Sequence, residues 1–329
     1  MYYNGVNVIN SNCPICFSIG SRSTGKSFFW KRYCIKNYIK KGEKFIYLRR
    51  NVVDCDISNR TFFDDIGQKF PGYSCVAKDH EYILTKNGNS ECCGYFFALT
   101  EVSKIKSVAL ESVTTIFFDE FLPENNRYLK PMDPTYEPNL LLSLYFTVAR
   151  GYNKPIRDNV LLICAANMIS LYNPYFSFFK IDLTRVNKQV VNYVYAERVE
   201  NEAIKDIINQ SKFGKILSGT SYGSYAVDNE SLFRFDRHIS KVPAKSKIFC
   251  ALFCYMWYLV FYDDNGNIYI KPGYDATLKS KFRITDDCPE DVQKFSGDIV
   301  KLFRKLYQDD KIYYNSSETR SKVAGFIEY

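Results

Sequence analysis

Gly20-Ser21-Arg22-Ser23-Thr24-Gly25-Lys26-Ser27 has the pattern glycine, four residues and then Gly-Lys-Ser, which is a complete phosphate-binding loop. The glycines allow backbone N–H groups to turn inward and surround the α- and β-phosphates of a nucleotide. The Lys26 ammonium can reach the β- and γ-phosphates, and the Ser27 hydroxyl can bind Mg²⁺. We therefore predict that this whole stretch forms a nucleotide site, with Lys26 in a catalytic role and Ser27 as a metal ligand.

The residues on both sides of the loop fit a strand, a loop and a helix in succession. Residues 15–19 are a short apolar run, which is typical of a buried strand. Over residues 26–40 apolar side chains recur at helical spacing, at Phe29, Tyr33 and Ile39. A glycine-rich turn before a helix is the alternative, but strand, loop and helix is the context that a phosphate-binding loop requires.

Strand and helix patterns continue to alternate through the first half of the chain. This alternation predicts an α/β fold, with a mostly parallel sheet and helices on both faces. Such sheets bind ligands at the carboxyl ends of their strands, where the phosphate-binding loop lies. We expect further strands at 44–48, 73–77, 81–85, 95–99, 114–118 and 159–165, a turn at 86–89, and helices at 61–70 and 139–148.

The pattern changes near Tyr195. We expect an amphipathic helix at 197–212, a Gly/Ser/Thr-rich linker at 218–224, strands at 247–262 and 268–271 joined by a turn at 263–267, and a helix from Pro289 to about Tyr307. The chain is therefore divided into three predicted parts. These are a P-loop ATPase domain at 1–196, a helical and flexible linker at 197–228, and a smaller α+β domain at 229–329.

Composition supports this division and limits the class of protein. The chain has 329 residues, 46% of them apolar, which is enough for two cores. No apolar run approaches the roughly 20 residues of a membrane span, and no secretion signal is evident at the N-terminus. The net charge of +8 fits a polyanionic partner. Eleven scattered cysteines, an odd number, favour reduced thiols in a cytoplasm.

Cys13-Pro14-Ile15-Cys16 is a C-x-x-C motif, but no second pair lies at zinc-site spacing. A redox or zinc role is one interpretation. The other is that these are small residues leading into the first strand.

The second strong motif is Thr114-Thr115-Ile116-Phe117-Phe118-Asp119-Glu120. Its apolar residues predict a buried strand, and Asp119 at the carboxyl end can hold the Mg²⁺ that bridges the phosphates. Glu120 can polarise a water in line with the γ-phosphate. A strand that ends in a solvated turn is the alternative, but the Asp-Glu pair after a phosphate-binding loop favours ATP hydrolysis coupled to work.

Two more polar residues are candidates for the phosphate site. The Arg22 guanidinium can reach the β- and γ-phosphates as charge builds in the transition state, or it can simply face solvent. Asn167 follows the apolar strand at 159–165, where it can contact the γ-phosphate or orient water, with helix capping as the alternative.

Arg150, in Val148-Ala149-Arg150-Gly151, ends a predicted helix. It can complement the dipole of that helix, or it can act as an arginine finger in a neighbouring subunit. Lys104 and Lys106 lie in a polar stretch, and the composition of this stretch favours a solvated surface.

Taken together, these residues resemble the DNA-packaging motor ATPases of phi-29-like bacteriophages, a branch of the additional-strand, catalytic-glutamate (ASCE) P-loop ATPases. The similarity extends through a linker and is thin in the last hundred residues. It rests on the loop at 20–27, Phe45-Ile46-Tyr47-Leu48-Arg49-Arg50, Phe118-Asp119-Glu120-Phe121, Thr147-Val148-Ala149-Arg150 and Asn173-Pro174-Tyr175-Phe176.

The resemblance implies a ring of ATPases, typically five, that drives double-stranded DNA through the portal of a procapsid. It would make Lys26, Ser27, Asp119 and Glu120 the ATP site within one subunit. Arg150 would be a finger acting in a neighbouring subunit, and Lys106 a candidate lysine acting in the same way. It also implies residence at the procapsid vertex in the cytoplasm of the infected bacterial host, with no membrane partner.

For the last part of the chain, the resemblance implies an RNase H-like fold that has lost nuclease activity and contacts packaging RNA and the portal or capsid. Asp236, Asp263 and Asp264 are the obvious acids there, and they make no convincing metal set. Two interpretations stay open for the basic residues of this part of the chain: they form a surface that binds RNA phosphates, or they form a plain solvated face. These residues are Lys241, Lys245, Lys247, Lys279, Lys281 and Arg283.

Two other functions stay open from the sequence. A helicase or remodelling ATPase would prefer single strands or unwind duplexes. A nucleotide-gated scaffold that binds RNA or capsid would work with weak turnover and would tolerate loss of Glu120.

Overall fold

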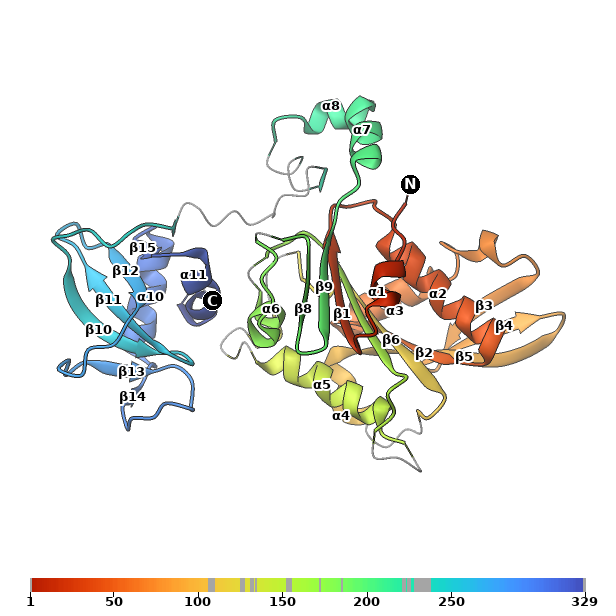
Figure 1. Ribbon diagram of the computed structural model, residues 1–329, viewed down its shortest axis with the longest axis horizontal. Coiled ribbons are helices and arrows are strands. Elements are labelled where there is room, and N and C mark those ends of the chain that lie inside the picture. Colours follow the sequence, from red (N-terminus) through yellow and green to blue (C-terminus); the bar gives the residue numbers. More distant parts are fainter. Residues whose placement is uncertain are drawn as a thin grey trace. The chain divides into compact units, whose positions relative to one another are not determined.

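The computed structural model describes residues 2–105, 110–124, 128–130, 133, 135–151, 156–171, 173–184, 186–220, 223, 226–227 and 238–327. The chain divides into two compact units (Figure 1). The first contains Met1–Leu129, Tyr136–Leu171 and Phe179–Leu232, and the second contains Lys130–Thr135, Tyr172–Phe178 and Phe233–Tyr329.

A sheet of nine strands forms the first unit, in the order β3-β4-β5-β2-β6-β7-β1-β9-β8 among the residues described. Strands β5, β2, β6, β7, β1 and β9 run parallel, and antiparallel hairpins close both edges. The predicted α/β class with a mostly parallel sheet is therefore confirmed. The strands are β1 (Ile15–Gly20), β2 (Lys44–Arg49), β3 (Tyr73–Lys78), β4 (Glu81–Lys86), β5 (Asn89–Ala98), β6 (Val113–Asp119), β7 (Leu161–Asn167), β8 (Lys188–Val191) and β9 (Val194–Val199).

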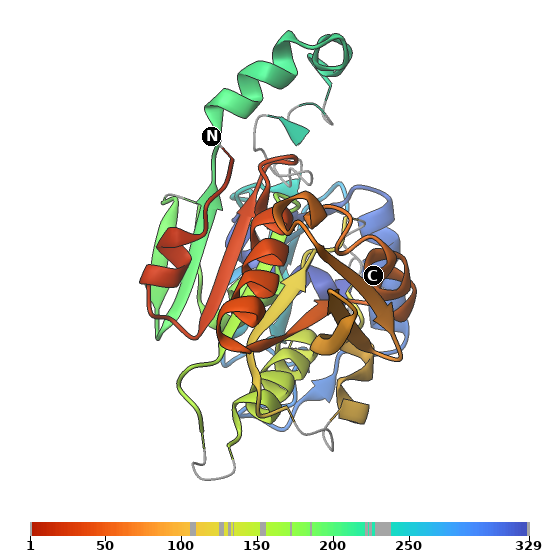
Figure 2. The same ribbon diagram turned by 90° about the vertical axis from the view of Figure 1, so that its right-hand side faces the viewer.

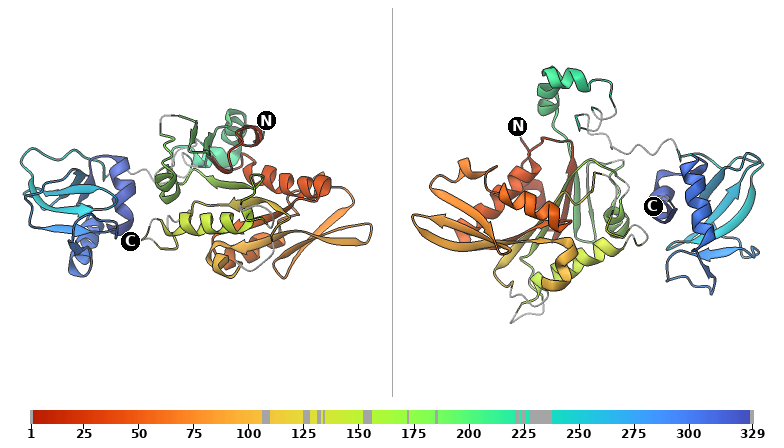
Figure 3. Two further views of the ribbon diagram at one scale, coloured as in Figure 1. Left: turned by 60° about the horizontal axis from the view of Figure 1, so that its bottom comes forward. Right: turned by 180° about the vertical axis from the view of Figure 1, so that it is seen from behind.

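Helices cover this sheet on both faces (Figure 3). Side chains alternate between the faces of a strand, so Phe45 and Tyr47 of β2 share one face. They belong to the same apolar cluster as Trp30 of α2 and Cys55 of α3, while α5 lies on the other side against β6. The helices are α1 (Val6–Asn10), α2 (Lys26–Lys41), α3 (Val52–Arg60), α4 (Val102–Ile105), α5 (Tyr136–Ala149), α7 (Glu202–Gln210) and α8 (Lys212–Leu217).

The predicted helix at 61–70 is wrong. The helix lies earlier, as α3, and residues 61–66 form turns before a 3₁₀ turn at Gly67–Lys69. Asn59 lies near the end of α3, where its side-chain oxygen accepts a hydrogen bond from the Tyr82 hydroxyl at 2.6 Å. Phe62 and Ile66 are fully buried although they lie in turns. Their helix-like spacing therefore comes from the burial of both side chains and not from a helix.

The helix expected at 197–212 is interrupted. Its first residues belong to β9, because Glu197 pairs with Ser18 of β1 in the parallel ladder. The helix α7 begins only after Asn201, whose side-chain oxygen accepts a hydrogen bond from the Ile204 N–H. Ser211 then caps the separate helix α8.

The second unit has a sheet of six strands in the order β14-β13-β10-β11-β12-β15 within the described part of the chain. Its core includes Tyr258, Phe303 and Tyr314. The elements are β10 (Lys247–Phe253), β11 (Trp257–Tyr262), β12 (Ile268–Pro272), β13 (Lys281–Arg283), β14 (Gln293–Lys294), β15 (Ile312–Tyr314), α6 (Pro174–Phe179), α10 (Asp298–Gln308) and α11 (Ser317–Ile327).

Two predictions for this unit are corrected. Residues 247–262 are two antiparallel strands, because the chain reverses at Tyr255, which has a φ of 59°. The helix expected from Pro289 begins at Asp298, after Gly297 at a φ of 64°. The turn at 263–267 is confirmed, and the Asp263 carboxylate accepts hydrogen bonds from the N–H groups of Asn265 and Asn267.

Within the described residues, no helix combines the length and the apolar character that crossing a membrane requires.

Candidate nucleotide-binding site

The phosphate-binding loop connects β1 directly to α2, as the sequence predicts. Gly20 is the last residue of β1, and a Cβ there would lie 2.4 Å from the Val199 carbonyl oxygen, so a larger residue cannot fit. Gly25 precedes α2 with a φ of 91°, which favours glycine. The Thr24 hydroxyl donates a hydrogen bond to the Ser21 carbonyl oxygen at 3.2 Å, which connects two residues of the loop.

Lys26 lies at the centre of this loop. Its ammonium donates to the carbonyl oxygens of Gly20 at 3.2 Å and Ser21 at 2.9 Å, and it contacts the Thr24 hydroxyl at 2.9 Å. Burial lowers the pKa of Lys26 to about 7, while the carboxylates of Asp119 and Glu197 oppose that shift. The lysine is therefore held in the loop, with two negative charges nearby.

Ser27 and Asp119 meet at the carboxyl edge of the sheet. The Ser27 hydroxyl donates to Asp119 Oδ1 at 2.7 Å, across 92 residues of sequence. Asp119 ends β6, is buried, and accepts a second hydrogen bond at Oδ2 from the Tyr47 hydroxyl at 3.1 Å. A hydroxyl beside a carboxylate is the oxygen donor set that Mg²⁺ prefers, so these residues fit the predicted metal site.

Glu120 follows with a left-handed backbone, at a φ of 57°. Its side chain is 52% exposed and forms an ion pair with Arg49, whose Nη2 lies 2.5 Å from Glu120 Oε2. Non-glycine residues with positive φ are uncommon and are concentrated at functional sites. This turn directs Glu120 away from the buried strand that carries Asp119.

Arg49 also lies at this site, although the sequence interpretation gave it no role there. It ends β2, next to β6 in the sheet, and its guanidinium also lies 3.7 Å from Asp119 Oδ2. Burial would lower the pKa of Arg49, but Tyr47, Glu120 and Asp119 outweigh burial and raise it. Burial, followed by the charge of Asp119, raises the pKa of Tyr47, so this phenol stays a hydrogen-bond donor.

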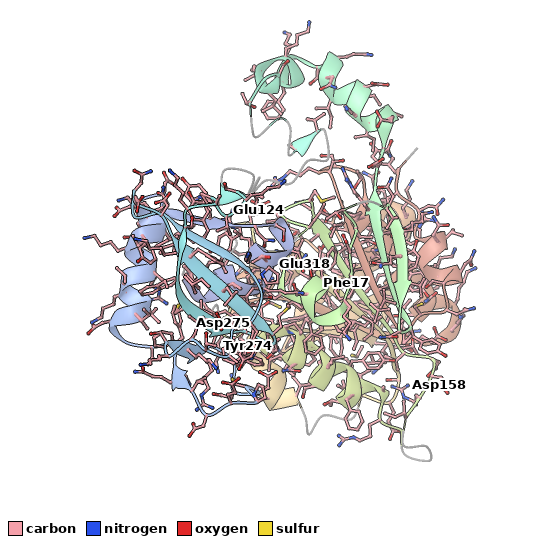
Figure 4. The ribbon with its side chains drawn as sticks, turned by 60° about the vertical axis from the view of Figure 1, so that its left-hand side comes forward. Phe17, Glu124, Asp158, Tyr274, Asp275 and Glu318 are labelled. Atoms are coloured by element: carbon pink, nitrogen blue, oxygen red, sulfur yellow. The ribbon has the colours of Figure 1, made fainter. Side chains whose placement is uncertain are left out.

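Arg50, the next residue, has a structural partner. It forms a buried ion pair with Glu137 of α5 and donates to the Phe121 carbonyl oxygen. Glu137 also accepts from the Leu129 N–H at 2.6 Å. These bonds fix the chain just after Glu120. Phe17 of β1 lies inside the first unit (Figure 4). Its ring centroid is 5.2 Å from that of Phe121.

Arg22 forms an ion pair with Glu124, four residues beyond Glu120. Its predicted contact with phosphates stays a prediction. Asn167 lies beside the loop, because it pairs with Gly20 in the β1–β7 ladder, and the Met168 N–H donates to the Gly20 carbonyl at 3.0 Å. The next helix is capped by Asn173, since Asn173 Oδ1 accepts from the Phe176 N–H.

Arg150 directly follows α5 and is exposed. Its role as a finger stays a prediction. Lys104 is exposed and pairs with Glu101 at 3.4 Å. Lys106 and Asp236 lie outside the described residues.

All eleven cysteines are free. Cys16 is buried and donates to the Cys13 carbonyl at 3.4 Å, and burial raises its pKa to about 12. In the part of the chain that the structure describes, His, Cys, Asp and Glu side chains form no group of three suited to a metal ion.

Comparison with known proteins gives a consistent result. Residues 1–318 match the family of the Podovirus DNA encapsidation protein (Gp16). The DNA packaging protein of Bacillus phage phi29 is 31% identical over 294 residues, which is 87% of this chain and 83% of that protein. The DNA packaging protein of Bacillus phage B103 is 33% identical, covering 90% of this chain and 88% of that protein.

Two solved structures are similar as well. One is the N-terminal domain of the DNA packaging ATPase from bacteriophage phi29, with 32% identity, a TM-score of 0.52, and coverage of 60% of this chain and 96% of that one. The other, from the bacteriophage Phi-29 viral genome packaging motor assembly, has 27% identity and a TM-score of 0.68, and covers 97% of this chain and 96% of that one. This chain therefore belongs to the Podovirus DNA encapsidation protein (Gp16) family.

Proposed function

We propose that this chain is the ATP-hydrolysing subunit of a motor that drives double-stranded viral DNA into a procapsid. The observation that carries the proposal is the convergence of Lys26, Ser27, Asp119 and Glu120 at one edge of the sheet, in a member of the encapsidation family. The loop and these side chains together can bind a nucleoside triphosphate and direct water at its γ-phosphate. ATP is the nucleotide that we assign to the site.

Within this site each residue has its own task. Backbone N–H groups of residues 20–27 surround the phosphates, and the Lys26 ammonium neutralises the β- and γ-phosphates. Ser27 and Asp119 would hold Mg²⁺, which when bound stabilises charge on the phosphate oxygens. We expect Asn167, which pairs with Gly20 in the sheet, to contact the γ-phosphate end of the nucleotide. Arg22 would contact the phosphates as well once its guanidinium separates from Glu124.

Glu120 orients and activates the attacking water, and Arg49 controls when it does so. The Arg49 guanidinium holds the Glu120 carboxylate in an ion pair at the end of the neighbouring strand. Glu120 therefore has to leave Arg49 before it can accept a proton from water. This release gives the motor a step at which hydrolysis can wait for DNA or for a neighbouring subunit.

Arg150 completes the site from a neighbouring subunit in a ring of five. A cation added in the transition state raises the rate of phosphoryl transfer strongly, by about 10³-fold or more. Hydrolysis by isolated chains is then weak, and it rises when the ring assembles. Lys106 is a second candidate for this role.

In this proposal the second unit contacts the other components of the packaging motor. We assign it to packaging RNA and to the portal or capsid, as an RNase H-like domain without nuclease activity. The lack of nuclease activity fits Asp263, because its carboxylate is engaged by hydrogen bonds within the turn at 263–267. The domain boundaries of this proposal are 1–196, 197–228 and 229–329, and the motor works in the cytoplasm of the infected host.

The test is steady-state ATP hydrolysis without nucleic acid, with single-stranded DNA and with double-stranded DNA. Stimulation mainly by double-stranded DNA is the expected result. Equal or greater stimulation by single strands would instead identify a helicase or remodelling ATPase.

A further inference from the structure

A carboxylate is buried directly beside the phosphate-binding loop. Glu197 of β9 is 4% exposed, and three hydroxyl groups surround it. Its Oε1 accepts hydrogen bonds from the Tyr3 hydroxyl at 2.8 Å and the Ser18 hydroxyl at 2.9 Å, and its Oε2 accepts from the Tyr195 hydroxyl at 2.9 Å. A buried charge is costly to maintain, so such a group calls for an explanation beyond packing.

One of these hydroxyl groups links Glu197 to the loop. Tyr3 belongs to the N-terminal strap, which we define as Tyr2-Tyr3-Asn4 and which lies beside the ends of β1 and β9 (Figure 2). The Tyr3 N–H donates to the Thr24 carbonyl at 2.9 Å. The Tyr3 ring also packs edge-on against Phe29 of α2, with 5.6 Å between centroids.

The strap also contacts the start of α2. Tyr2 Cδ1 lies 3.3 Å from the position that a Cβ of Gly25 would occupy. The strap therefore touches two consecutive residues of the loop, Thr24 and Gly25, whose backbone must hold its N–H groups toward the phosphates. Its position depends on Tyr3, and Tyr3 is fixed at its far end by Glu197.

We propose that Tyr3 and Glu197 are positioning residues of the nucleotide site, which latch the strap onto Thr24 and Gly25 and so raise affinity for the diphosphate part of the nucleotide. The proposal rests on the proposed use of ATP at this loop. A loop that is held in its binding conformation loses less entropy when the ligand binds. Within the part of the chain that the structure describes, no hydrogen bond or ring contact joins the strap to Ser27, Asp119 or Glu120, so the latch acts on binding and leaves the chemical step unchanged.

Tyr3→Phe tests this latch with little disturbance, because it removes the hydroxyl and keeps the ring. Tyr195→Phe is the matched control, since it removes one hydroxyl from the same carboxylate without touching the strap. The probe is a fluorescent ADP analogue, titrated into each chain, with KM and kcat for ATP measured in parallel. Thermal melting establishes that both variants fold.

We expect Tyr3→Phe to weaken ADP binding and raise KM for ATP by about tenfold, the usual order for one hydrogen bond to a charged group. The value of kcat stays unchanged, and Tyr195→Phe binds ADP like the parent chain. Unchanged ADP binding by Tyr3→Phe would overturn the latch. So would equal weakening by both variants, because that result means that the cluster only stabilises the fold.

Failure of the proposed function is a separate outcome. If the parent chain binds ADP but does not hydrolyse ATP, the ATPase assignment fails, while a selective loss of ADP binding in Tyr3→Phe still supports the latch.

Discussion

Arg49 Nη2 and Glu120 Oε2 lie 2.5 Å apart, so the residue that we assign to water activation is engaged by a cation from the neighbouring strand. The guanidinium is 13% exposed and also faces Asp119, which fixes its position at the edge of the sheet. In our proposal this pair joins the two residues that decide whether hydrolysis proceeds.

Replacement of Arg49 by alanine should release Glu120. We expect ATP hydrolysis in the absence of DNA to rise by up to about fivefold, which corresponds to the ~1 kcal/mol of a partly exposed ion pair. Steady-state turnover without DNA is the measurement, and Arg60→Ala on the exposed end of α3 is the control. A loss of activity as large as that of Glu120→Gln would show that Arg49 is required for the reaction.

The Tyr47 hydroxyl should tune the metal site. Tyr47→Phe removes the hydrogen bond to Asp119 Oδ2. Loss of a group that orients a metal ligand commonly lowers metal affinity by about tenfold or more. We therefore expect half-maximal ATP hydrolysis at about ten times the Mg²⁺ concentration. Tyr33→Phe, which leaves Asp119 untouched, is the control, and an unchanged Mg²⁺ dependence in Tyr47→Phe would contradict the assignment of Asp119.

The buried pair of Arg50 and Glu137 should stabilise the first unit. Glu137→Ala leaves the Arg50 cation buried, and we expect the free energy of unfolding to fall by about 3 kcal/mol. In a Trp257→Phe background, fluorescence of the buried Trp30 reports on this unit. Lys104→Ala breaks an exposed pair and should cost less than about 1 kcal/mol. Equal effects of the two changes would exclude a special role for the buried pair.

If Arg150 acts as an arginine finger in a neighbouring subunit, mixing two inactive variants should restore ATP hydrolysis. Glu120→Gln and Arg150→Ala are each expected to be inactive, but a mixed ring contains sites with an intact Glu120 and an intact neighbouring Arg150. Random assembly of equal amounts makes about one site in four complete, because the two residues come from adjacent subunits of a head-to-tail ring. Recovery of ATP hydrolysis measures this fraction, and no recovery would place Arg150 outside the site.

The local sequence was sufficient to predict the phosphate-binding loop and the position of Asp119. It was not sufficient to predict which distant residues contact them. The pattern at 20–27 and the buried strand before Asp119 depend on residues adjacent in sequence, and the structure has both as predicted. Arg49 meets Glu120 only because β2 lies next to β6 in the sheet. The order of strands in a sheet is set by long-range packing, which no short motif records.

Glu197 illustrates the same limit. Its charged surroundings in sequence suggested the face of a helix, whereas its pairing with Ser18 places it in a strand with its carboxylate buried. The helix predicted at 61–70 was wrong for a related reason, since Phe62 and Ile66 are buried from turns. In each case tertiary contacts overrode the local pattern.

The most direct test of the account combines ATP hydrolysis and DNA packaging for Glu120→Gln in a reconstituted procapsid system. We predict that this variant still binds ATP, loses DNA-stimulated hydrolysis by at least about 10²-fold, and packages no DNA. Packaging that continues without Glu120 would contradict our proposal that ATP hydrolysis at this site drives packaging, because the motor would then draw its work from another site or from none in this chain.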